Sequence, residues 1–192
     1  DLFKPSDTDA TVCNWYASDP NHSDHRFQFA FDMTSPVSYA YDDAGQRAFM
    51  DRTVNSVGTG DQLVPRVALA PTGSHVIVWQ DDSSSADGAG NHDIMARGFE
   101  PGGCAGFADI VVNQSTAGHQ HSPAIAMDSQ GNFVVAWVDD PSHNGNSRIR
   151  ARGFSADGKE RFAEFVVSAT GTAQQRHPAI AMAPDGNFVI VW

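Results

Sequence analysis

Short apolar segments, separated by glycine, proline, aspartate and asparagine, follow one another along most of this chain, and one order of segments returns three times. Each copy has a proline, an apolar segment, a glycine turn and a second apolar segment that ends in tryptophan. The prolines, Pro65, Pro123 and Pro178, are 58 and 55 residues apart. A period in this range is typical of propellers, solenoids and arrays, whose units bury their apolar faces against each other.

Each full copy predicts four short strands, at about 65–70, 75–80, 93–99 and 108–113 in one copy and at about 123–127, 132–138, 148–154 and 163–168 in the next. These segments are rich in Val, Ile, Phe and Trp and are bounded by turn residues, as strands are. No segment has the period of about 3.6 residues that indicates a helix. The second strand is apolar on both faces, which indicates that both faces are covered.

We therefore predict an all-β fold, a β-propeller or a propeller-like array of four-stranded repeats of about 55–58 residues, incomplete in this chain. Residues 1–35 are a divergent N-terminal segment, and the copies cover about 36–64, 65–122 and 123–177, with a partial copy at 178–192. Closed propellers need about four to eight blades. We expect the ring to be completed by the remainder of a longer chain or by further copies in a homo-oligomer.

Glycines mark the predicted turns. The segments 71–73 and 184–186, Pro-Thr-Gly and Pro-Asp-Gly, predict hairpins with the glycine in the left-handed conformation. Later in each copy, Gly45, Gly103 or Gly158 predicts another hairpin, in which residues at equal distances from the glycine face each other.

Across this later hairpin we expect one aromatic pair and one cation–carboxylate pair, each contributing roughly 0.2–1 kcal/mol. In the first copy tyrosine replaces the cation. The expected pairs are Tyr41–Phe49 with Tyr39–Asp51, Phe99–Phe107 with Arg97–Asp109, and Phe154–Phe162 with Arg152–Glu164.

The charge of the chain limits its partners. With 12 basic and 23 acidic residues, the net charge is −11 at pH 7, which argues against nucleic acid and anionic membrane surfaces. No apolar run reaches the roughly 18 residues of a membrane span, so we expect no membrane insertion. Cys13 and Cys104 are the only cysteines; they are compatible with one disulfide in a secreted protein or with two unrelated thiols.

A family motif can be recognised in three stretches of the chain. They are the run from Trp79 to Phe99, the segment 107–113 and Gln120-His121-Ser122-Pro123. Together they resemble a repeat of large secreted bacterial adhesin-like proteins, which often stands beside calcium-binding nonapeptide repeats of the repeats-in-toxin kind. The resemblance covers about residues 36–192 and implies a β-propeller and a secreted or cell-surface location. The segment 1–35 lies outside it.

The loop that follows the first tryptophan is a candidate calcium site. Calcium takes about six to eight oxygen ligands, often from alternate Asp, Asn or Ser residues of a glycine-turned loop. The alternative is a solvated loop with Asx turns. The candidate ligands are Asp81, Asp82, Ser83, Ser85, Asp87 and Asp93.

Trp79 and Trp137 end equivalent strands, and Arg97 and Arg152 follow at equivalent positions. One hypothesis makes the tryptophans platforms on which sugars stack, with the arginines as polar partners. The other packs the tryptophans at the edges of the blades, with each arginine over the tryptophan or paired with an aligned acid.

Histidines form two short clusters, at 22–25 and at 119–121. The alternation of His119 and His121 places two imidazoles on one face of a strand, which is suited to zinc or copper. Neither cluster contains a third ligand locally, so the interpretation without a metal is favoured.

Nothing in the chain indicates a nucleophilic enzyme. It has no Gly-x-Ser-x-Gly motif and no cysteine in a known catalytic context. Acids that recur once per copy, Asp51, Asp109 and Glu164, suit structural pairing, because a catalytic pair would interrupt the repeat.

From these observations we predict a non-catalytic binding or structural repeat module of a secreted or cell-surface bacterial protein, acting in adhesion. Its partner is a glycan or a protein surface. The alternatives are a glycan-binding propeller lectin and a propeller domain of a larger secreted hydrolase.

Overall fold

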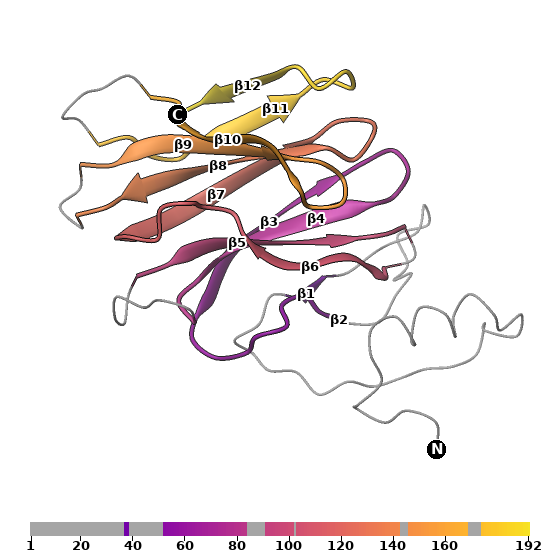
Figure 1. The fold of residues 1–192 in the computed structure, drawn as a ribbon, viewed down its shortest axis with the longest axis horizontal. Coiled ribbons are helices and arrows are strands. Elements are labelled where there is room, and N and C mark those ends of the chain that lie inside the picture. The colour runs from indigo at the N-terminus through magenta and orange to yellow at the C-terminus, as the bar shows by residue number, and fades with distance from the viewer. Residues whose placement is uncertain (1–36, 39–51, 84–90, 102, 143–145, 169–173) are drawn as a thin grey trace, which may run out of the picture.

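The computed structural model describes residues 37–38, 52–83, 91–101, 103–142, 146–168 and 174–192 (Figure 1). In these ranges the secondary structure consists of strands, which confirms the all-β prediction. No helix of the described residues is long and apolar enough to cross a membrane. The strands are β1 (Val37–Ser38), β2 (Arg52–Thr53), β3 (Gln62–Leu69), β4 (His75–Asp81), β5 (Asp93–Phe99), β6 (Ala105–Val111), β7 (His119–Met127), β8 (Phe133–Asp140), β9 (Arg148–Phe154), β10 (Glu160–Val166), β11 (Ala179–Met182) and β12 (Phe188–Val191).

The strands form antiparallel sheets in which neighbours along the chain are neighbours in the sheet. One four-stranded sheet has the order β3-β4-β5-β6, and a second has the order β7-β8-β9-β10. The two-stranded sheets β1-β2 and β11-β12 accompany them. Antiparallel order with short turns is the arrangement expected of consecutive hairpins.

The sheets are stacked face to face (Figure 1). Between the two four-stranded sheets, a buried cluster joins Val78 and Ile94 of the first sheet to Val135 and Trp137 of the second. The opposite face of the second sheet packs on Ile180 and neighbouring residues of β11 and β12. Both faces of the central strands are therefore covered, as their continuous apolar runs predict.

Three hairpins, β3–β4, β7–β8 and β11–β12, have the same turn. Gly73, Gly131 and Gly186 have φ angles of 90°, 87° and 90°, in a region that side chains disfavour. The amide of each glycine donates to a carbonyl three residues earlier, at 2.9, 3.2 and 3.0 Å. The left-handed glycines predicted at 73 and 186 are confirmed.

A backbone irregularity accompanies the prolines of the three copies. The pairing of β3 with β4 shifts between Leu63 and Arg66, and the residues before the prolines, Val64, Ser122 and His177, have φ angles of 53°, 54° and 54°. Proline cannot donate to a ladder and is tolerated at such bulges. A β-branched residue in this region is unusual, so the surrounding sheet holds Val64 there.

The predicted register of the later hairpins is correct far from the turn, where Ala96 lies opposite Ile110 and Ala151 opposite Phe165, and wrong near the turn. In β5–β6, Phe107 lies opposite Gly98 rather than Phe99, and Phe99 lies opposite Ala105. A register shift between these pairs moves the alignment, because a bulge places two residues of one strand against one of its partner. The Tyr41–Phe49 and Tyr39–Asp51 pairs lie outside the described residues.

The second sheet has the same departure from the prediction. Phe162 lies opposite Gly153, whereas Phe154 lies opposite Glu160. A Cβ atom added at Gly153 would overlap the ring of Phe162. The space above the glycine is therefore filled by the aromatic ring, which decides the register in place of an aromatic pair.

The contact of Gly98 with Phe107 gives a first prediction. A Cβ atom at Gly98 would overlap the ring of Phe107, whereas a Cβ atom at Gly106 would find its nearest neighbour at 3.7 Å. We expect Gly98→Ala to lower the free energy of unfolding by about 1–3 kcal/mol, because overpacking displaces the ring. Gly106→Ala, the matched control in the same sheet, should stay within about 0.5 kcal/mol of the wild type. Urea denaturation measures both, and equal effects would contradict the packing described here.

Candidate functional site

The tryptophans predicted as sugar platforms lie in the core. Trp79 and Trp137 both have an exposed fraction of 0%. The indole of Trp79 donates to Asp81 Oδ2 at 3.0 Å, and Trp137 belongs to the cluster between the four-stranded sheets. Neither ring can stack on a sugar in this arrangement, so the packing interpretation is the one that fits the structure.

Arg97 and Arg152 lie where two sheets meet. Arg97 Nη1 donates to the backbone carbonyl of Val54 at 3.0 Å, and Arg152 Nη1 donates to that of Val112 at 2.8 Å. Val54 follows β2 and Val112 follows β6, so each arginine reaches back to the end of the preceding sheet. Both acceptor residues are fully buried, where an unpaired carbonyl would be costly.

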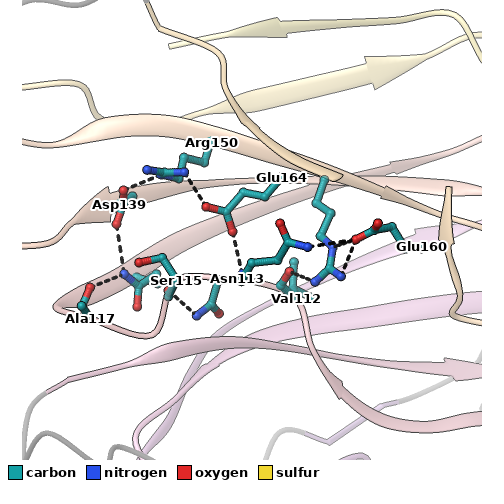
Figure 2. Close-up of polar contacts among 11 residues, drawn as sticks. Val112, Asn113, Ser115, Ala117, Asp139, Arg150, Glu160 and Glu164 are labelled. Atoms are coloured by element: carbon teal, nitrogen blue, oxygen red, sulfur yellow. Dashed lines mark hydrogen bonds and ion pairs between the residues drawn. The ribbon is translucent and has the colours of Figure 1, made fainter. Parts of the chain in front are cut away.

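In each case a carboxylate from the sheet of the arginine binds the same segment of the preceding sheet as the arginine does. Asp109 Oδ2 accepts from the amide of Ser56 at 2.8 Å and from its hydroxyl at 2.6 Å. Glu164 Oε2 accepts from the amide of Gln114 at 2.6 Å. We call each arginine and carboxylate, together with the segment 54–56 or 112–114, an inter-sheet clamp. Figure 2 shows the second clamp.

Each arginine also lies over an aromatic ring of its own strand. The guanidinium carbon of Arg97 is 5.6 Å from the ring centroid of Phe99, and that of Arg152 is 5.1 Å from the centroid of Phe154. This geometry is that of a cation–π contact. The sequence hypothesis placed each arginine over a tryptophan, whereas the rings are those of Phe99 and Phe154.

The predicted cation–carboxylate pairs are confirmed in one sheet and wrong in the other. Arg97 and Asp109 are 3.6 Å apart, as expected. Arg152 instead pairs with Glu160 at 2.6 Å, although the pairing next to it, Ala151 opposite Phe165, keeps the predicted register. The first sheet has Ala105 at the position of Glu160, so it offers Arg97 no carboxylate there. Glu160 was not recognised from the sequence.

Glu164 pairs with Arg150 in place of the expected Arg152. Arg150 Nη1 lies 2.5 Å from Glu164 Oε1, and Arg150 Nε lies 2.5 Å from Asp139 Oδ2 (Figure 2). Asp139 Oδ1 also accepts from the fully buried Gln120 at 3.0 Å. Met95 occupies the equivalent position in the first sheet, so the repeat contained no signal for this arginine.

In the predicted calcium loop, the described acids accept hydrogen bonds from the protein. Asp81, which is 2% exposed, accepts from the amide of Ser83 at 2.8 Å and from its hydroxyl. Asp82 Oδ1 accepts from the amide of Asp61 at 2.5 Å. The contacts of Asp81 are the Asx-type contacts of the alternative hypothesis, whereas the contact of Asp82 joins it to a residue 21 positions earlier in the chain.

Asp93, which lies opposite Asp81 in the pairing of β4 with β5, is also engaged by the protein. Asp93 Oδ1 accepts from the side-chain amide of Asn113 at 2.6 Å, and Asn113 in turn accepts from the amide of Ile94 at 2.7 Å. Ser85 and Asp87 lie outside the described residues. Within the part of the chain that is described, no three His, Cys, Asp or Glu residues are arranged to hold a metal ion.

The structure adds a third imidazole to the predicted pair on one strand. His119 and His121 of β7 have ring centroids 4.7 Å apart, and His92, from the preceding sheet, lies 4.7 Å from His119. Burial lowers the pKa of His121, and the nearby carboxylate of Asp140 opposes this shift. The cluster at 22–25 lies outside the described residues.

Cys104 is disulfide-bonded. Cys13, the other cysteine of the chain, lies outside the described residues, so their pairing stays a prediction. The chain matches no protein-family model, and no curated protein matches it.

Removal of one clamp arginine should destabilise the fold. We expect Arg152→Met to lower the free energy of unfolding by about 1–3 kcal/mol, because it leaves the buried carbonyl of Val112 without this donor. Arg161, which is half exposed and 3.8 Å from Asp128, offers a control of the same type: Arg161→Met should change the stability by less than about 1 kcal/mol. Chemical denaturation compares the two. An Arg152→Met protein as stable as the wild type would contradict the clamp.

Proposed function

We propose that this chain is a non-catalytic structural and binding module of a secreted or cell-surface protein, acting in adhesion. The observation that carries the proposal is the use of its recurring polar residues. Arg97, Asp109, Arg152 and Glu164 all bind the backbone of the preceding sheet. Groups that could have formed a repeated catalytic or ligand site are thereby engaged in joining the sheets. Such a scaffold presents its turns and loops to a partner.

We further propose that the sheets are blades of a propeller or of a propeller-like array. Two four-stranded antiparallel sheets of the same strand order support this. The contacts between sheets concentrate on the first strands, β3, β7 and β11. In a propeller the first strands of the blades surround the axis, and the later strands spread outward.

The secreted or surface location has two supports. Cys104 is disulfide-bonded, and disulfides persist in oxidising compartments. The net charge of −11 favours solubility and is unsuited to polyanionic partners. The partner predicted from the sequence is therefore a glycan or a protein surface.

Binding and catalysis can be separated directly. Beads coated with the folded chain should be retained on at least one surface of a panel of immobilised glycans and extracellular matrix proteins. Beads coated with the heat-unfolded chain serve as the control. Arg152→Met, assayed where it is fully folded, should bind as the wild type does, because Arg152 contacts the protein backbone rather than a ligand. Turnover of glycoside or ester substrates, without retention on any surface, would overturn the proposal.

Calcium binding by the loop after β4 remains a prediction of the sequence. Ligands that bind only the folded state raise the melting temperature, so calcium should raise it relative to the same protein in chelator. Asp82→Asn should reduce this difference, whereas Asp185→Asn, at an exposed turn, should preserve it. The same melting temperature with calcium and with chelator would remove calcium from the proposal.

A further inference from the structure

Three imidazoles meet where the first four-stranded sheet packs on the second. His119 and His121 lie on β7 of the second sheet, and His92 directly precedes β5 of the first. The centroids of adjacent rings in the row His92–His119–His121 are 4.7 Å apart. Protonated imidazoles at this distance would repel each other strongly in a partly buried site.

The same contact joins the backbones of the two sheets. The amide of Gln120, between the two histidines of β7, donates to the carbonyl of His92 at 2.9 Å. The amide of Ser122 donates to Gln80 Oε1 of the first sheet, also at 2.9 Å. Gln120 is fully buried. A change in the charge of the imidazoles therefore acts directly on hydrogen bonds between the sheets.

Burial and the neighbouring groups favour the neutral form of His121. Both ring nitrogens of His92 are buried and have no hydrogen-bond partner among the described residues. Around His121, burial is the largest influence and lowers its pKa; Asp140 opposes it, while His92, Arg176 and His177 act in the same direction as burial. The net effect is a lowered pKa of His121, because Asp140 does not balance burial and the other neighbours together.

Equivalent positions at the next contact between sheets do not titrate in this way. Ser147 stands 55 residues after His92, and its hydroxyl donates to the carbonyl of Gln175 at 2.8 Å. Gln174 and Arg176 stand at the positions of His119 and His121. The imidazole cluster is therefore a property of this one contact rather than of the repeating pattern.

We propose that the cluster of His92, His119 and His121 makes the contact between the two four-stranded sheets sensitive to acid, so that this contact loosens when the imidazoles take up protons. The inference does not depend on the adhesive function. It assigns to the chain a response to acidic surroundings, such as those met by a surface protein in an acidified compartment.

The direction of the effect follows from linkage. The pKa of His121 in the folded protein lies below the ordinary value of about 6.5. The neutral side chain therefore contributes stability above about pH 6.5, and the contribution is lost as the pH falls below that value toward the folded-state pKa. Asp157, whose pKa is lowered to about 2 by hydrogen bonds from Lys159 and Ser155, titrates well below this range.

Amide hydrogen exchange of the wild-type chain tests the proposal locally. Between about pH 7.5 and about pH 5.5, the protection factors of the Gln120 and Ser122 amides, corrected for intrinsic exchange, should fall severalfold. The amide of Val112, which donates to Ile94 within the first sheet, should keep its protection. Chelator in all samples removes any effect of a bound cation. Unchanged protection at Gln120, or an equal loss at Val112, would overturn the proposal.

A pair of variants tests the assignment to the cluster. His92→Gln removes one imidazole and should reduce the fall in protection at Gln120. His75→Gln is the control, because His75 stacks on Phe99, 5.1 Å away and outside the cluster, and should leave the fall unchanged. A His92→Gln protein with the full acid response would overturn the proposal. If this variant does not fold, the wild-type measurement at Gln120 still decides.

Discussion

Two strands, β4 and β8, are apolar on both faces, and the rest of the structure depends on covering both of those faces. If either face of these strands lay against water, large apolar side chains would be exposed. Trp79 and Trp137, for example, are 0% exposed in the stacked sheets. Each buried CH₂ group contributes about 0.8 kcal/mol, so the free energy favours sheets packed in sequence over a single solvated sheet. The stacking in Figure 1 is the direct result.

Apolar packing is not directional, and it does not by itself align one sheet with the next. The clamps supply this alignment, because hydrogen bonds have strict geometry. An arginine and a carboxylate bind one short segment of the preceding sheet in both clamps, so that buried backbone groups are paired rather than orphaned. The recurring charged residues, which in the sequence are the natural candidates for a ligand or catalytic site, thus serve to join the sheets.

Where prediction from sequence succeeded and failed can be traced to particular residues. The turn glycines were predictable, because Gly73 and Gly186 follow local rules for left-handed backbone. The Arg97–Asp109 pair was also predicted from the sequence. The Arg152–Glu164 pair does not form, because Arg150 pairs with Glu164 and Glu160 pairs with Arg152. The first sheet has Met95 and Ala105 at the positions of Arg150 and Glu160, so the repeat did not reveal these competing partners.

The sequence by itself determined the strands, their turns and the burial of both faces of each central strand, because these depend on side-chain polarity and local backbone preferences. Only the tertiary structure decided which groups meet between sheets. It placed Trp79 and Trp137 in the core, paired Arg150 with Glu164, and brought His92 to the two histidines of β7. Such contacts join residues far apart in the chain, and their geometry depends on how whole sheets pack.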